Sequence, residues 1–301
     1  MMQLSDNMRG ALLMCIAMAA LTCGDAAIKA TGGAMPLSQL LVIRGIIASG
    51  ALLIMARYLG ALRFDLPRHD QALVLARGIA EAVAAYFFLS ALLAMPLANV
   101  TALMQMLPLT VTLGGAIVFR EAVGWRRWVS IAVGFCGMLL IVRPGTEGFT
   151  SASVYTLCAV GAVTVRDLVT RRVSMATPSL MVTFVSSVIV TLFAGVWSFG
   201  QDWVPLTPRL TLLVLTASAF IVGAYLTSVM VMRVGQVSFV APFRYTGLVW
   251  ALILGWLLFG EWPQPLTLIG ASIIAAAGAF NLLREARLNR KVRRPIVPRQ
   301  P

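Results

Sequence analysis

Acidic and basic side chains stand four residues apart at several places inside long apolar stretches of this sequence. One turn of a helix brings positions i and i+4 to the same face, where opposite charges can form an ion pair. A lone charge in hydrocarbon costs roughly 2.5–3.5 kcal/mol on insertion scales, so such groups are usually paired or face water. Three acid–base pairs have this spacing: Asp25 with Lys29, Arg77 with Glu81, and Asp167 with Arg171.

Two of these pairs, Asp25/Lys29 and Asp167/Arg171, close apolar stretches in two different parts of the chain. One interpretation is mutual neutralisation, or snorkelling of the long basic side chains at a helix end. The other is a gating role, in which each ion pair tightens when one side of a membrane pathway closes. The residues alone leave both interpretations open.

Arg44 and Arg244 each lie about eight residues inside an apolar stretch and have no acid three or four positions away. A guanidinium offers a planar fork of donors that can bind a carboxylate or phosphate with two hydrogen bonds. Both arginines, and the deep pair Arg77/Glu81, are therefore candidates for contact with an anionic or zwitterionic substrate. A purely structural role is the alternative for each.

Prolines interrupt two of the apolar stretches near polar side chains: Pro108 follows Gln105, and Pro242 precedes Arg244. Proline removes a backbone hydrogen bond and can interrupt a helix, so polar side chains beside it are candidates for a site inside the membrane. Aromatic residues can line such a site, although they also serve as packing and interface groups. The candidate substrate-binding residues are Arg44, Arg77, Glu81, Tyr86, Gln105, Arg244, Tyr245 and Trp250. We expect them around a midplane cavity lined by the first, third, fourth, sixth, eighth and ninth spans.

Residue patterns that would support enzymatic chemistry are missing from the sequence. The single histidine, His69, stands beside Arg68 and Asp70 in a polar segment, which excludes a His-based metal site or Ser-His dyad within the membrane. No Gly-rich phosphate loop occurs, and the four cysteines have no paired spacing. The sequence predicts no enzyme, no metal and no cofactor.

Composition identifies the surroundings of the chain. Hydrophobic residues make up 59% of its 301 residues and charged residues 12%, against roughly a quarter in a soluble domain. Mean hydropathy is +0.89. The apolar runs are continuous and long enough to cross a bilayer, which takes roughly 20 residues each, and they lack the alternation of barrel strands. We predict an all-α integral membrane protein with ten transmembrane helices, at residues 9–30, 37–55, 71–94, 97–119, 125–142, 151–172, 180–199, 210–232, 236–259 and 266–283.

The net charge of +13 is distributed unevenly along these segments. With the N-terminus inside, 17 lysines and arginines fall in cytoplasmic segments and 2 in external ones. The positive-inside rule then predicts two cytoplasmic termini for a multi-pass protein of a bacterial inner membrane. We expect the basic tail, residues 285–301, to meet anionic lipid headgroups rather than nucleic acid.

The sequence contains an internal repeat. Asp25, Lys29 and Pro36 recur as Asp167, Arg171 and Pro178 at an offset of 142, and Phe119-Arg120-Glu121 recurs as Phe259-Gly260-Glu261 at an offset of 140. Gly137 and Gly278 follow at an offset of 141. We predict five-helix repeats at residues 8–143 and 150–284. Because five is odd, the second repeat would enter the membrane inverted, which is a transporter architecture.

These features resemble the drug/metabolite transporter superfamily, in its branch with two EamA domains, over about residues 8–285. The resemblance rests on Asp25-Ala-Ala-Ile-Lys29, Arg77-Gly78, Met95-Pro96-Leu97-Ala98-Asn99-Val100, Phe119-Arg120-Glu121, Gly124-Trp125-Arg126-Arg127-Trp128, Arg143-Pro144-Gly145, Val240-Ala241-Pro242-Phe243-Arg244-Tyr245 and Phe259-Gly260-Glu261. It implies a secondary transporter, monomeric or homodimeric, that exports small zwitterionic or anionic metabolites such as amino acids by alternating access. The alternatives are a membrane-embedded receptor or scaffold, and a carrier of the same superfamily that imports a vitamin or nucleotide-like metabolite.

Overall fold

The computed structural model describes residues 6–62, 66–120, 124–145, 149–174, 176–234 and 240–292. Every regular element within these ranges is a helix. In chain order they are α1 (Asp6–Lys29), α2 (Leu37–Tyr58), α3 (Arg68–Ala94), α4 (Leu97–Met104), α5 (Leu107–Val118), α6 (Trp125–Val142), α7 (Ser151–Thr170), α8 (Ser179–Trp197), α9 (Pro208–Val234), the 3₁₀ helix η1 (Ala241–Tyr245), α11 (Thr246–Phe259) and α12 (Pro265–Val292).

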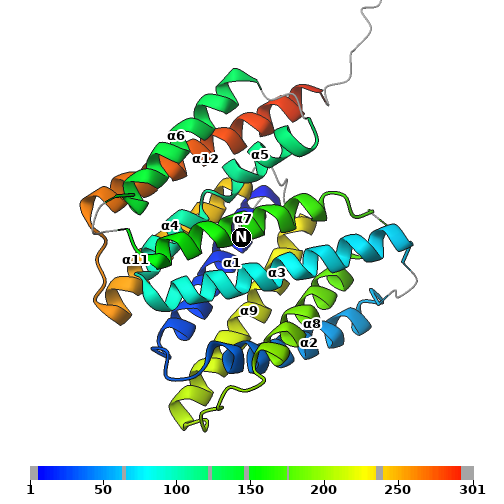
Figure 1. Ribbon diagram of the computed structural model, residues 1–301. Helices are drawn as coiled ribbons and strands as arrows, with labels where there is room; N and C mark the ends of the chain where they lie inside the picture. The colour runs from blue at the N-terminus through cyan, green and yellow to red at the C-terminus, as the bar shows by residue number, and fades with distance from the viewer. Residues whose placement is uncertain are drawn as a thin grey trace, which may run out of the picture.

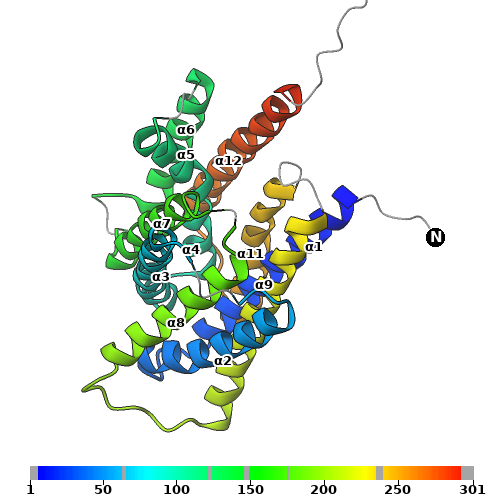
Figure 2. The ribbon, with the colours of Figure 1, turned by 90° about the vertical axis from the view of Figure 1, so that its right-hand side faces the viewer.

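These helices supply ten apolar segments long enough to cross a membrane, all within the described ranges, which confirms the predicted fold class. Helices α4 and α5 together make one span, and η1 with α11 makes another. The ninth span, expected from residue 236, begins at Pro242, and residues 235–239 lie outside the described part of the chain. The beginning of α1 and the end of α12 lie at the same end of the bundle (Figure 2).

Both expected interruptions are present. Helix α4 ends at Met104 and α5 begins at Leu107, which places Pro108 in the first turn of α5. An N–H in a first turn has no partner within its helix, so the missing N–H of proline costs no hydrogen bond there. Pro242 likewise lies at the start of η1. The backbone between α4 and α5 and the 3₁₀ turn of η1 are therefore the two points where a span changes its helical path.

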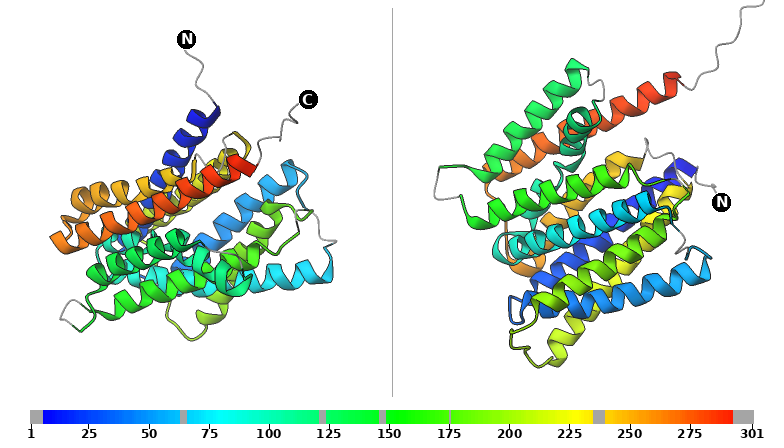
Figure 3. Two further views of the ribbon diagram at one scale, coloured as in Figure 1. Left: turned by 90° about the horizontal axis from the view of Figure 1, so that it is seen from above. Right: turned by 45° about the vertical axis from the view of Figure 1, so that its right-hand side comes forward.

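Side-by-side packing joins helices that are distant in the sequence (Figures 1 and 3). The most extensive contacts pair α1 with α9, α3 with α7, α6 with α12, and α2 with α8. In Figure 1 the α6–α12 pair forms one edge of the bundle and the α2–α8 pair the opposite edge, with α3 and α7 between them.

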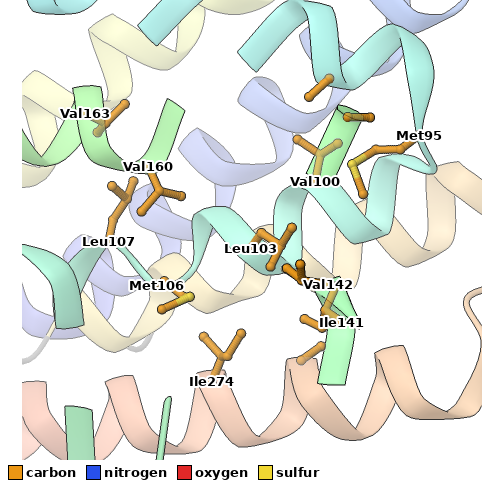
Figure 4. Close-up of a cluster of buried hydrophobic side chains, with 14 of the residues drawn as sticks. Met95, Val100, Leu103, Met106, Leu107, Ile141, Val142, Val160, Val163 and Ile274 are labelled. Carbon is orange, nitrogen blue, oxygen red and sulfur yellow. The ribbon is translucent and has the colours of Figure 1, made fainter. Parts of the chain in front are cut away.

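Figure 4 shows a buried apolar cluster in which side chains from both halves of the chain meet. Leu103 of α4, Ile141 of α6, Val160 of α7 and Ile274 of α12 are each less than a tenth exposed. Lipid tails are as apolar as these side chains, so their packing stabilises the bundle mainly through van der Waals contact. The cluster fixes the first half of the chain against the second.

Two glycines set the close approach of α6 to α12. A Cβ on Gly270 would lie 2.5 Å from the carbonyl oxygen of Gly137, and a Cβ on Gly137 would lie 2.8 Å from the carbonyl oxygen of Gly270. Backbone atoms cannot move aside as a flexible side chain can. Both positions therefore need glycine to keep the two helices at this separation.

Replacing Gly270 with alanine should separate α6 from α12 and destabilise the fold by about 1–3 kcal/mol, the usual effect of overpacking. The expected result is a lower melting temperature of the purified protein in detergent. Gly161→Ala is the matched control, because no atom lies within 4 Å of a Cβ added there. Equal melting temperatures for the two variants would contradict the close approach.

Candidate substrate cavity and gate

A cavity of about 440 Å³ lies between α2, α3, α7, α8 and α9. This volume falls within the roughly 300–1,000 Å³ range of small-molecule sites. Its charged lining consists of Arg44 from α2, Arg77 and Glu81 from α3, and Arg166 from α7, and Tyr225 of α9 adds a phenol. Three guanidinium groups therefore face one carboxylate.

Arg44 enters the cavity from the third turn of α2. The next residue, Gly45, allows α2 to touch α8, since a Cβ there would clash with the Thr191 hydroxyl. No hydrogen bond or ion pair joins the Arg44 guanidinium to another group in the described ranges; its electrostatic neighbours include Asp25 of α1 and Tyr225. The planar fork of Arg44 donors is therefore available to a ligand.

Glu81 and Arg166 join α3 to α7 across the cavity. Arg166 Nη1 donates to both carboxylate oxygens of Glu81, at 3.1 and 3.3 Å. The other side of the same guanidinium binds Asp167, with Arg166 Nη2 2.8 Å from Asp167 Oδ1. One arginine is thus held between two carboxylates, and its charge is matched within the protein.

Arg77 is also held by protein groups. Its Nε donates to the Thr170 hydroxyl at 3.0 Å, and its Nη1 donates to the Ser186 hydroxyl. Its Nη2 lies 4.0 Å from Glu81, at the outer limit of an ion pair. The predicted i, i+4 pair therefore forms only loosely, because Arg166 takes the close contacts with Glu81.

Hydroxyl groups from one face of α8 complete the polar lining. Thr183, Ser186 and Ser187 line the cavity, and the Ser187 hydroxyl lies 2.9 Å from the Ser49 hydroxyl of α2. Sequence reasoning did not select these residues, nor Arg166 or Tyr225. The available signal was the spacing of three and four residues from Thr183 to Ser186 and Ser187, which gathers hydroxyl groups on one side of an apolar helix.

A second charged cluster lies where α1, α3, α4 and α11 meet. Lys29 Nζ is 3.1 Å from Glu261 Oε1, and the two side chains are 9% and 25% exposed. Lys29 also donates to the carbonyl oxygens of Met95 at 2.7 Å and Leu92 at 3.3 Å. The second Glu261 oxygen accepts the backbone N–H of Leu97 at 3.1 Å. This Lys29–Glu261 cluster joins the end of a first-half helix to a second-half turn.

Local backbone geometry aims Glu261 at Lys29. Helix α11 ends at Phe259, and the next residue, Gly260, has a φ of 65°, in the left-handed region that favours glycine. The N–H of Glu261 then bonds the carbonyl oxygen of Gly255 at 3.0 Å and turns the chain back. The ring of Phe259 adds a cation–π contact, 5.6 Å from the Lys29 ammonium.

Three of the four candidate gating residues have close partners other than the ones predicted from spacing. Lys29 pairs with Glu261, while the electrostatic neighbour of Asp25 is Arg44. Asp167 binds its neighbour Arg166. Arg171, at the end of α7, is exposed.

The remaining candidate substrate-binding residues lie outside this cavity lining. Tyr86 packs edge-on against Trp197, and Trp250 is 37% exposed. Gln105 donates to the backbone oxygen of Arg244 at 3.4 Å, and the Arg244 residue is itself exposed. The Tyr245 ring packs on Gly278, where a Cβ would overlap its hydroxyl group.

The cavity is lined by the second, third, sixth, seventh and eighth spans, in place of the expected first, third, fourth, sixth, eighth and ninth. The difference has a packing cause. Helix α1 packs against α9 and α11, and α4 packs against α11 and α7. The first, fourth and ninth spans therefore contact one another, and α2 and α8 contribute walls instead.

A model of the EamA-like transporter family matches residues 8–143 and 150–283. The chain belongs to this family. Its ten apolar helices and bacterial relatives make it a multi-pass protein of the bacterial inner membrane. Its named relatives are transporters rather than enzymes.

The relatives differ in their named cargo. A riboflavin transporter of Vibrio cholerae serotype O1 is 30% identical over 193 residues, or 64% of each chain. An S-adenosylmethionine uptake transporter of Rickettsia prowazekii is 26% identical over 63% of this chain and 64% of its own length. The pseudopaline exporter CntI of Pseudomonas aeruginosa is 27% identical over 89% of this chain and 94% of its own. The chain thus spans slightly under two thirds of the first two relatives.

A solved structure, described only as the crystal structure of a protein, has the same fold. It superposes with a TM-score of 0.65 and 16% sequence identity over 96% of this chain and 100% of its own length. At this identity the similarity concerns the arrangement of helices alone.

Proposed function

We propose that this protein is a secondary transporter that carries small anionic or zwitterionic metabolites, such as amino acids, through the cavity around Arg44. The observation that carries the proposal is the Arg44 guanidinium, which lines the cavity without an ion pair or hydrogen bond to any described residue. A charge left in a low-dielectric site is costly unless a partner reaches it. A substrate carboxylate or phosphate would supply that partner.

Charge balance in the cavity supports an anionic group on the substrate. Arg166 is matched by Glu81 and Asp167, and Arg77 lies beside Glu81 and two hydroxyl groups. Arg44 has the Asp25 carboxyl as an electrostatic neighbour but forms no ion pair with a described carboxylate, and Arg77 reaches Glu81 only at 4.0 Å. A bidentate arginine–carboxylate contact is also directional, so it would orient the substrate as well as bind it.

Acceptor groups elsewhere in the cavity lining suit the amino group of a zwitterion. Glu81 and the α8 hydroxyls line the same cavity as Arg44. A carboxylate at Arg44 and an ammonium group near Ser187 would each gain a charge-assisted hydrogen bond. The cavity volume leaves room for a side chain beyond these two groups.

We further propose that two inverted repeats exchange roles during transport. The packing supports this proposal: the first span contacts the eighth as the sixth contacts the third. The second and seventh spans, and the fifth and tenth, pair with each other, as exchange of two halves requires. Under the predicted topology, the Lys29–Glu261 cluster closes the external side of the cavity.

Counterflow into liposomes that contain only this chain tests the proposed function. Vesicles preloaded with one amino acid, vitamin or nucleoside should accumulate the labelled compound when it bears a carboxylate or phosphate. Counterflow detects a carrier in either direction, which matters because the named relatives include uptake transporters and an exporter. Accumulation restricted to cationic or uncharged compounds would refute the substrate class, and no accumulation of any compound would refute the carrier.

A further inference from the structure

A second hollow, of about 480 Å³, lies on the outside of the bundle between α6 and α12. These two helices form an edge of the molecule in Figure 1, away from the α2–α8 pair that borders the substrate cavity. The walls of this groove are Val129, Val133 and Phe280, with Ala277 between them.

The lining of this groove is almost entirely apolar along its length. Ser130 is the one hydroxyl residue of the lining, and its Oγ donates to the carbonyl oxygen of Ala277 at 2.7 Å. Val129, Val133 and Phe280 are each 44–51% exposed, so the apolar walls are open to whatever lies outside. In a bilayer, an acyl chain matches such a surface.

One end of the groove is aromatic and basic. Trp125 begins α6, is 70% exposed, and holds the Arg126 guanidinium 5.4 Å from its ring. Arg284 of α12, next to this end of the groove, reaches to within 3.5 Å of the position a Gly124 Cβ would take. Its Nη1 is buried and has no hydrogen-bond partner.

This basic end lies at the membrane surface. Trp125 is the first residue of its span, and Arg284 is the last residue of the final span. Tryptophan and arginine at span ends lie at the depth of lipid headgroups. The sequence that follows Arg284 adds five basic residues and one acid over residues 285–294, so the surrounding charge is strongly positive.

We infer that this groove is a binding site for an anionic phospholipid. One acyl chain would lie along Val129, Val133 and Phe280, and the phosphate would lie at the basic end of the groove, beside the guanidinium groups of Arg126 and Arg284. A second copy of this chain fits less well. A two-fold interface brings the same patch of each subunit together, so two basic ends would meet and repel.

Native mass spectrometry of the purified full-length protein tests this site with two lipids that share dioleoyl chains, phosphatidylglycerol and phosphatidylcholine. Wild-type protein should retain phosphatidylglycerol roughly 30-fold better, as expected for two arginines near an anionic headgroup. Arg126→Gln/Arg284→Gln should lose this preference. The control, Arg57→Gln/Arg209→Gln, removes two exposed arginines outside the groove and should retain it.

A third variant separates the acyl chain from the headgroup. Val133→Trp fills the apolar wall from its exposed side and should weaken retention of both lipids, with the melting temperature reporting intact folding. Equal retention of the two lipids by wild-type protein would overturn the proposal, as would an unchanged preference in Arg126→Gln/Arg284→Gln. Efficient disulfide crosslinking of Val133→Cys between two copies in native membranes would identify a dimer interface and overturn it too.

Discussion

Replacing Arg44 with alanine is expected to lower the flux of an anionic substrate in liposomes on the order of a hundredfold. Truncating one side of a buried charge-assisted contact costs roughly 2–5 kcal/mol, and each 1.4 kcal/mol is tenfold in affinity. Arg44→Lys keeps the charge but loses the fork of donors, so its flux should be intermediate. Arg57→Ala, near the exposed end of the same helix, should transport normally.

A control is needed because Arg44 also acts electrostatically on Asp25. Removing Arg44 alone leaves the Asp25 carboxylate without that neighbour and could lower stability rather than binding. The double variant Arg44→Ala/Asp25→Asn removes both charges and should melt at the temperature of the wild type. Its transport should stay as low as that of Arg44→Ala, and recovery of transport would show that Arg44 only neutralises Asp25.

Replacing Lys29 with methionine is expected to open the membrane side at which Glu261 lies. The substitution removes an ion pair, two hydrogen bonds to backbone carbonyls and a cation–π contact. Breaking a buried pair from one side costs up to about 3–5 kcal/mol. When the closed state loses this stabilisation, the ratio of open to closed protein rises about tenfold for every 1.4 kcal/mol.

Cysteine labelling from that side measures the shift. The reporter is Val190→Cys, in the cavity lining, in a chain whose four native cysteines have been replaced. Lys29→Met and Glu261→Gln should each accelerate labelling at least tenfold, and the double variant should add little to either. Arg209→Gln removes an exposed arginine at the start of α9 and should leave the rate unchanged. Additive effects of Lys29→Met and Glu261→Gln would contradict a shared gate.

The membrane helices were predictable because their signals are local. Each span is a continuous apolar run, and the interruptions follow from Pro108 and Pro242 within those runs. Three residues that line the cavity were also predictable, because Arg44, Arg77 and Glu81 are charged residues far from the ends of their apolar spans. A charged side chain at this depth of the membrane is costly against lipid, so it usually faces a polar or water-filled cavity inside the bundle.

Partners across the fold were not predictable from spacing. Glu261 follows Lys29 by 232 residues, and Arg166 follows Glu81 by 85. Neither contact therefore produces a recognisable residue spacing within one helix. Depth in a span also says nothing about rotation around the helix axis. Arg244 was predicted to lie as deep in its span as Arg44, yet the described span begins at Pro242, so Arg244 lies in the 3₁₀ turn of η1 and is exposed.

The selectivity of counterflow tests the central claim most directly, namely that Arg44 recognises an anionic group of the substrate. The measurement compares a transported carboxylate with its uncharged carboxamide in liposomes that contain wild-type protein or Arg44→Ala. Wild-type protein should prefer the carboxylate strongly, and Arg44→Ala should transport the two compounds at similar low rates. A preference for the carboxylate that survives in Arg44→Ala would contradict the claim.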